Sequence, residues 1–120
     1  MDCHTLSRYC LEKRGATESF PFGDSVRVFK VMNKVFALMP INAPLQISLK
    51  CEPSLAYMLR LTYTGVQPGY HLNKDHWNTV TCDGSIPDAE LLGMIDHSYE
   101  LVVKGLTRKD REKLAAEGRD

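Results

Sequence analysis

The chain has 120 residues, of which 43% are hydrophobic and 25% are charged, and these values are typical of one globular domain. Fifteen basic side chains balance fifteen acidic ones, so the formal net charge is zero. A protein that binds nucleic acid chiefly through its phosphates is usually basic overall. The charge balance therefore argues against a dedicated electrostatic DNA binder and leaves room only for a local basic face.

No apolar run approaches the roughly 18 residues that a membrane span needs, and the first ten residues lack the pattern of a secretory signal. The four cysteines include no C-x-x-C pair, which argues against zinc-ribbon and thioredoxin-type motifs. We therefore expect a cytoplasmic protein that does not bind membranes, in which the cysteines serve as small buried apolar groups.

The first half of the chain predicts one helix, three strands and the start of a second helix. Residues 2–13 fit a helix that Asp2 caps, and residues 15–25 (GATESFPFGDS) are predicted to form a loop. Residues 26–39 are rich in β-branched and aromatic side chains and predict a hairpin, which turns at Met32-Asn33-Lys34 because asparagine tolerates the left-handed conformation. A third strand is expected at 45–49, and Pro53 is suited to open the second helix.

The second half predicts two strands and two helices. Strands are expected at 66–70 and 78–82, on either side of the connection HLNKDHW (71–77). Residues 85–105 carry a long apolar stripe at helical spacing, with an S-x-x-D capping pattern at Ser85 and Asp88 and Gly105 at the end. A short charged helix follows, for which Thr107 is the expected cap.

This order predicts an α+β fold, built as a two-layer sandwich with an antiparallel sheet of about five strands and helices on one face. The connections are short, which favours antiparallel neighbours, whereas a doubly wound parallel sheet would need a helix at each crossover. We expect residues 1–120 to form one domain.

Three segments resemble the MmcQ/YjbR-like family of small bacterial proteins. They are SLKCEPSLAYMLR (48–60), GYHLNKDHWNTV (69–80) and DGSIPDAELLGMIDHSYELV (83–102). The resemblance implies a fold similar to bacterial frataxin (CyaY-like) and kinship with a double-wing DNA-binding architecture. An iron-binding activity would depend on a densely acidic helix surface. The first helix departs from that pattern, because its acidic residues are mixed with Arg8, Lys13 and Arg14.

The connection HLNKDHW permits two interpretations. Its polar and aromatic side chains could hold a phosphate backbone and an unstacked base. Alternatively, Leu72 and Trp77 fill space in the core while Asn73 caps a turn at 74–76. Arg27 and Lys30 differ in strand parity, so one regular strand cannot project both to the same face. The candidate nucleic-acid contacts are Lys34, Lys50, Arg60, His71, Asn73, Lys74 and His76.

The sequence contains no motif that indicates a catalytic or a metal site. The G-x-S-x-G, P-loop and G-x-G-x-x-G patterns are missing, and no cysteine has an evident neighbouring base. A metal site from His71, His76, Cys82 and Asp83 lacks a recognised ligand spacing. We therefore expect no catalytic residues, no metal and no cofactor. The sequence favours a non-catalytic binding module for which DNA is the candidate partner, with a protein-interaction or small-ligand-binding domain as the alternative.

Overall fold

The fold was analysed in a computed structural model that describes residues 1–42, 44–69 and 72–117. Within these ranges the elements follow in the order α1 (Cys3–Leu11), β1 (Ala16–Ser19), β2 (Val26–Val31), β3 (Lys34–Pro40), β4 (Gln46–Lys50), α2 (Pro53–Thr62), β5 (Val66–Pro68), β6 (Trp77–Thr81), α3 (Asp88–Lys104) and α4 (Arg108–Glu117). The predicted α+β class is confirmed. Among the described residues, no helix combines the length and the apolar character that crossing a bilayer requires.

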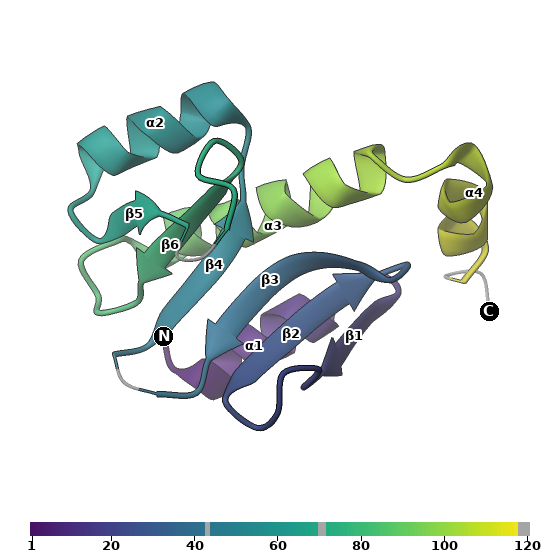
Figure 1. The fold of residues 1–120 in the computed structure, drawn as a ribbon, viewed down its shortest axis with the longest axis horizontal. Coiled ribbons are helices and arrows are strands. Elements are labelled where there is room, and N and C mark those ends of the chain that lie inside the picture. Colours follow the sequence, from purple (N-terminus) through teal and green to yellow (C-terminus); the bar gives the residue numbers. More distant parts are fainter. Residues whose placement is uncertain (43, 70–71, 118–120) are drawn as a thin grey trace.

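The strands form one antiparallel sheet in the order β1-β2-β3-β4-β6-β5. Helices α1 and α3 lie behind this sheet in Figure 1, and their buried side chains, such as Leu6 and Ile95, join Phe29 and Ile47 in the core. Helix α2 packs at the β5–β6 end, where Asn78 Nδ2 donates to its backbone (3.4 Å). The predicted two layers, with helices on one face, are therefore confirmed.

The sheet has six strands among the described residues, whereas the sequence predicted about five. The additional strand is β1, which lies inside the segment predicted as a loop, so that prediction was wrong for residues 16–19. This strand is short and polar, with Thr17 and Glu18 exposed, and its only neighbour is β2. Pairing with β2 holds this edge strand in place, so the strand does not need an alternating apolar pattern and the sequence gives little sign of it.

Several local predictions are confirmed by the backbone. Asp2 caps α1 by accepting from the Thr5 amide (2.8 Å), and Met32 and Asn33 have φ values of 50° and 65° at the hairpin turn. The capping pattern predicted for α3 was wrong. Its N-terminal cap is Pro87, which makes no side-chain capping bond, and the Ser85 amide instead donates to a carboxylate within the preceding loop.

Helix α4 is attached to the rest of the fold near Gly15. Leu114 is the buried residue of α4. Gly15 has a φ of 70°, and a Cβ atom at this position would lie 2.5 Å from Leu114 Cδ1. Glycine therefore meets two needs here, since it adopts the left-handed conformation and leaves space for the leucine.

A buried serine joins α3 to the centre of the sheet. Strands β3 and β4 pair at Ala37↔Leu49 and Leu38↔Ser48, so Phe36 and Lys50 would form the next pair of the ladder. Instead, the Ser98 hydroxyl lies between them: it accepts from the Lys50 amide (2.9 Å) and donates to the Phe36 carbonyl (2.6 Å). Beyond this point β3 and β4 diverge (Figure 1). Ser98 thus replaces one direct hydrogen bond of the ladder, and it satisfies a backbone amide of β4 and a backbone carbonyl of β3.

A polar contact ties α1 to α3. Asp96 accepts hydrogen bonds from Lys13 Nζ and from the Tyr9 hydroxyl (2.6 Å). Burial tends to raise the pKa of the Asp96 carboxyl, but these hydrogen bonds outweigh burial and lower its pKa from 3.8. The carboxylate form is therefore favoured in the folded protein.

Replacing Ser98 by alanine should destabilise the fold. The change leaves a buried amide and a buried carbonyl without their shared partner, which costs about 1–3 kcal/mol. Urea unfolding measures this loss, with Ser25→Ala in the exposed β1–β2 loop as the matched control. A Ser98→Ala protein within about 0.5 kcal/mol of the wild type, the usual range for neutral surface changes, would show that the hydroxyl bridge carries little stability.

Replacing Asp96 by asparagine should make the free energy of unfolding less dependent on pH in the acid range. A carboxyl whose pKa is lowered by folding contributes stability above its unfolded pKa and loses it as the pH falls through the folded value. The free energy of unfolding of Asp96→Asn should thus lie below that of wild type at pH 7. The difference between the two free energies, called the gap below, should narrow as the pH falls from about 4 through the lowered pKa of Asp96. Urea titrations from pH 7 to pH 2.5 measure the gap, with Asp24→Asn as the control, and a constant gap would contradict the assignment.

Candidate functional site

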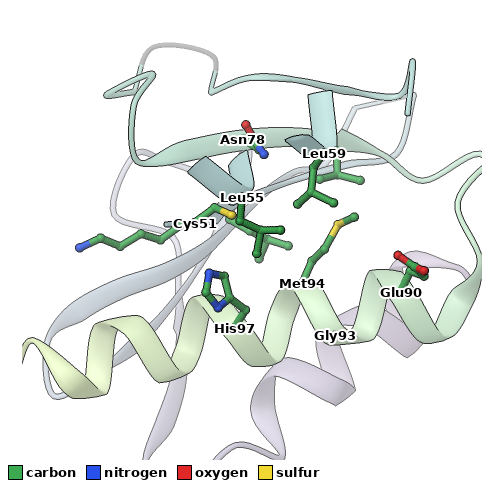
Figure 2. A pocket seen from close by; sticks show the side chains of 11 residues that line it. Cys51, Leu55, Leu59, Asn78, Glu90, Gly93, Met94 and His97 are labelled. Carbon is green, nitrogen blue, oxygen red and sulfur yellow. The ribbon is translucent and has the colours of Figure 1, made fainter. Parts of the chain in front are cut away.

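A pocket of about 250 Å³ lies between α2, α3 and strands β4 and β6. Figure 2 shows Leu55 and Leu59 reaching down from α2 toward Met94, which points up from α3. Leu49 and Val80 add apolar surface from the sheet. Most of the wall is therefore hydrocarbon, and the pocket offers an apolar surface to a ligand.

Polar groups stand at the two ends of this pocket. His97 and Cys51 lie at one end in Figure 2, and Glu90 lies at the other. His97 Nε2 accepts a hydrogen bond from the Glu52 amide (3.2 Å) at the start of α2. A ring nitrogen that accepts a hydrogen bond carries no proton, so Nδ1 is the ring nitrogen left to donate. Lys50, the last residue of β4, also lines the pocket.

Burial disfavours the reactive thiolate form of Cys51. Cys51 is only 4% exposed, and burial raises the pKa of its thiol to about 11. The thiolate, which is the reactive form of cysteine, is consequently scarce at pH 7. Cys51 serves the pocket as a small apolar wall.

A glycine in the middle of α3 widens the pocket. A Cβ atom added at Gly93 would meet no other atom within 4 Å, although glycine weakens a helix by about 1 kcal/mol relative to alanine. Gly93 lines the pocket at a position where a longer side chain would fill it. This position therefore lends itself to a pocket-filling substitution.

Arg60 holds the 72–77 connection onto α2. Its Nε donates to Asn78 Oδ1 (2.7 Å), and its guanidinium also donates to the backbone carbonyls of Lys74 and Trp77. Within the connection, Asn73 Oδ1 accepts from the Asp75 amide (2.9 Å), as expected for the cap of a turn at 74–76. These bonds fix the connection against the wall of the pocket.

Leu72 and Trp77 are half-buried, outside the main core, and pack around Gly69. A Cβ atom at Gly69 would lie 2.7 Å from Trp77 Cβ and 3.2 Å from Leu72 Cβ. The two side chains thus shape the base of the connection, and the prediction that they fill space in the core was wrong.

The structure brings together some of the predicted nucleic-acid contacts. Lys50 pairs with Trp77 across β4 and β6, so the exposed Lys74 and His76 lie at the same end of the sheet as Lys50. Lys34 lies instead at the tip of the β2–β3 hairpin, which points away from the end of β4 in Figure 1.

The other predicted contacts are less available to a ligand. Arg60 and Asn73 are engaged in the bonds described above, and His71 lies outside the described residues. Two exposed carboxylates, Glu52 and Asp75, interrupt the basic side chains. The resulting surface carries mixed charge and is not a uniform basic patch.

Metal ligands do not gather in the described part of the chain. In residues 1–42, 44–69 and 72–117, no three His, Cys, Asp or Glu side chains converge as a metal site requires. The four cysteines are free thiols, of which Cys10 and Cys51 are buried.

Sequence reasoning missed the pocket. The feature of the sequence that indicates the pocket is the apolar composition of α2. Leu55 and Leu59 of this helix line the pocket. Its other large apolar side chains, Tyr57, Met58 and Leu61, are exposed to solvent. A surface helix normally buries one stripe and leaves the other side polar. Apolar side chains around most of a helix are therefore a warning that it borders a cavity or a partner.

Comparison with known proteins identifies clear relatives. A family model described as YjbR matches residues 11–101. The uncharacterized protein YjbR of Escherichia coli K12 is 38% identical over 116 residues, which cover 95% of this chain and 98% of the relative. The uncharacterized protein YbdF of Escherichia coli O157:H7 is 34% identical over 111 residues, which cover 92% and 91% of the two chains.

Two solved structures have the same fold. The crystal structure of a Deinococcus radiodurans protein with a DUF419 domain matches with a TM-score of 0.87 and 41% identity, over 93% of this chain and 86% of that one. A crystal structure of a Pseudomonas syringae protein matches with a TM-score of 0.73 and 28% identity, over 84% and 98%. These similarities agree with the six-stranded sheet and four helices described above.

Proposed function

The chain belongs to the YjbR family, and we propose that it is a single-domain, non-catalytic binding module whose α2–α3 pocket takes a small, largely apolar ligand. The observation that carries the proposal is the pocket itself, an apolar space of about 250 Å³ with polar groups at its ends. Ligand sites in proteins are typically concave and mostly apolar, with a few polar groups that orient the ligand.

The lining indicates what kind of ligand fits. The volume, slightly below the usual range for drug-sized molecules, suits a compact body such as a single aromatic ring or a short hydrocarbon chain. The end with Lys50 and the Nδ1–H of His97 offers hydrogen-bond donors, whereas Glu90 at the other end offers an acceptor. The expected ligand is thus apolar along its length and carries a hydrogen-bonding group at one end.

Two observations support a non-catalytic role and a cytoplasmic location. The raised pKa of Cys51 removes the nearest candidate nucleophile, and its neighbour His97 has Nε2 engaged with the backbone. The four cysteines are free thiols, which suit a reducing compartment. Binding, without a chemical step, is what this pocket is built to do.

Indole, a neutral ring of nine heavy atoms, is a suitable probe of the pocket. A ligand gains at most about 0.3–1.5 kcal/mol per heavy atom, so for nine heavy atoms a dissociation constant near or below ~10 mM is expected. Amide chemical shifts of ¹⁵N-labelled protein should move in α2 and around Met94. Gly93→Leu fills the space and should weaken binding at least ~10-fold, which corresponds to about 1.4 kcal/mol.

Ala89→Leu is the matched control, because it adds the same side chain to an exposed position of α3 that does not line the pocket. This control should bind indole as the wild type does. Shift changes located away from α2 and α3, or equal affinities for Gly93→Leu and wild type, would refute the pocket as the binding site.

DNA is the second candidate ligand, and the cluster of Lys50, Lys74 and His76 at one end of the sheet favours it. The family resemblance supports this candidate as well, whereas Glu52 and Asp75 beside the cluster oppose it. Contacts of this kind would be with phosphates and would carry little sequence information.

Titration of labelled duplex DNA at two salt concentrations tests this candidate. Phosphate contacts should weaken as salt rises, and Lys74→Ala combined with His76→Ala should lower the affinity, whereas Lys109→Ala on α4 should not. Non-specific DNA binders reach about 10⁻⁴–10⁻⁶ M at physiological salt. A dissociation constant above ~10⁻⁴ M even at low salt, or equal affinities for the double variant and the control, would remove DNA from consideration.

A further inference from the structure

A second cavity, of about 290 Å³, lies between α1 and the β1–β2 edge of the sheet. It shares no lining residue with the α2–α3 pocket. Its lining is basic and polar on one side, with Arg27, Arg8, His4 and Ser7, and Leu11 and Phe20 contribute apolar surface. Two arginines line one cavity of a protein whose formal net charge is zero, and this local excess of positive charge needs a physical explanation.

The guanidinium of Arg27 has only weak partners. Arg27 projects from β2 toward α1, where its Nη1 donates to Cys3 Sγ (2.8 Å) and to Ser7 Oγ (3.2 Å). Its Nε is buried and has no hydrogen-bond partner. Among the residues that the structure describes, the ion pairs within 4.0 Å involve other cations, so no carboxylate lies within 4.0 Å of the Arg27 guanidinium.

A buried donor that lacks a hydrogen-bond partner is costly, and buried polar groups in native proteins nearly always have one. A thiol and a hydroxyl satisfy part of the guanidinium geometry but carry no negative charge. The planar fork of arginine matches the two oxygens of a carboxylate or a phosphate, which can bind it in a bidentate manner. The missing partner of Arg27 therefore has the chemistry of an oxyanion.

The remaining charges around the cavity also favour an anion. Arg8 and Arg27 are opposed within the lining by Glu18 alone, so with His4 neutral the lining carries a net positive charge. Arg8 also forms a surface ion pair with Glu12, but this pair is long (3.9 Å) and both side chains are about 70% exposed. Such exposed pairs are weak, so Arg8 can turn toward a ligand at little cost.

We propose that the cavity between α1 and β1 is a binding site for a small organic oxyanion, held by Arg27 and Arg8. The carboxylate or phosphate group contacts the guanidinium of Arg27, with Ser7 as a further donor. The hydrocarbon part of the ligand lies against Leu11 and Phe20, which are 40% and 42% exposed. This site is independent of the apolar ligand proposed for the α2–α3 pocket.

Phenyl phosphate, benzoate and benzyl alcohol are three probes that share a ring and differ in charge. On the full chain, amide shifts of residues 4–8, 18–20 and 27 should respond to the two anions, and benzyl alcohol should bind at least ~10-fold more weakly, which corresponds to about 1.4 kcal/mol. The anion with the lower dissociation constant shows whether the site prefers a phosphate or a carboxylate. Shifts in α2 and α3 alone, or equal binding of the neutral probe, would overturn the proposal.

Substitutions then test the two arginines. Arg27→Met keeps an unbranched side chain but removes the charge, and it should abolish anion binding while the spectrum stays that of a folded protein. Arg8→Ala changes an exposed side chain that the fold does not need, and it should weaken binding about 3–10-fold, the effect of about 0.7–1.4 kcal/mol.

Arg108→Ala, an exposed change on α4, is the control and should leave the affinity unchanged. If Arg27→Met does not fold, Arg8→Ala and the three probes still decide the question. Affinities unaffected by Arg8→Ala would show that Arg8 does not hold the anion, and no shift in residues 4–8 at about 10 mM phenyl phosphate would show that the cavity binds no anion. Either result overturns the proposal. The Gly93→Leu protein should bind phenyl phosphate normally, which separates this site from the α2–α3 pocket.

Discussion

The hydroxyl of Ser98 is the contact on which the architecture depends. Strands β3 and β4 pair over a short ladder, and the serine takes the place of the next direct bond between Phe36 and Lys50. Because a side chain from α3 occupies this position, the two strands can diverge without leaving buried backbone groups unsatisfied. The divergence carries the end of β4 toward α2 and away from the β2–β3 hairpin (Figure 1). The α2–α3 pocket lies on the β4 side of that separation.

Two arginines connect elements of this fold. Arg60 joins α2 to the connection before β6, and Arg27 joins β2 to α1. Both residues look like surface charges in the sequence, where nothing distinguishes them from Lys34 or Lys74. The difference between the two sites lies in the acceptors: Arg60 has an amide oxygen and two carbonyls, whereas Arg27 has a thiol and a hydroxyl. A guanidinium can be satisfied by neutral oxygens, and Arg27 has too few of them.

The elements that could be predicted from the sequence are those with local causes. Asp2 caps α1, and Asn33 adopts the left-handed conformation of the hairpin turn, because each effect depends on neighbouring residues only. Alternation along β2 puts Arg27 on the same face as Phe29 and Val31, which lie in the core, and Arg27 bonds to α1. Strand β1 could not be predicted, because its conformation comes from pairing with β2.

The candidate sites were predicted less well than the fold. The connection 72–77 was identified, and the cap role of Asn73 is confirmed, but the pocket that the connection borders was not foreseen. A cavity forms where several packed elements leave a space unfilled, so the apolar composition of α2 indicates a border and does not by itself locate the pocket. Arg27 illustrates the same limit: its face follows from parity, but its lack of an anionic partner depends on which side chains α1 and β1 bring near it.

The docking of α4 has a further consequence for how the molecule opens. Ten residues of this helix are anchored by the single buried side chain of Leu114, which fits over Gly15 because that residue has no Cβ. Elements with few buried contacts detach locally at a small fraction of the free energy needed for global unfolding. We therefore expect the C-terminal helix to detach before the sheet unfolds, and its departure would uncover the position of Gly15 that Leu114 covers.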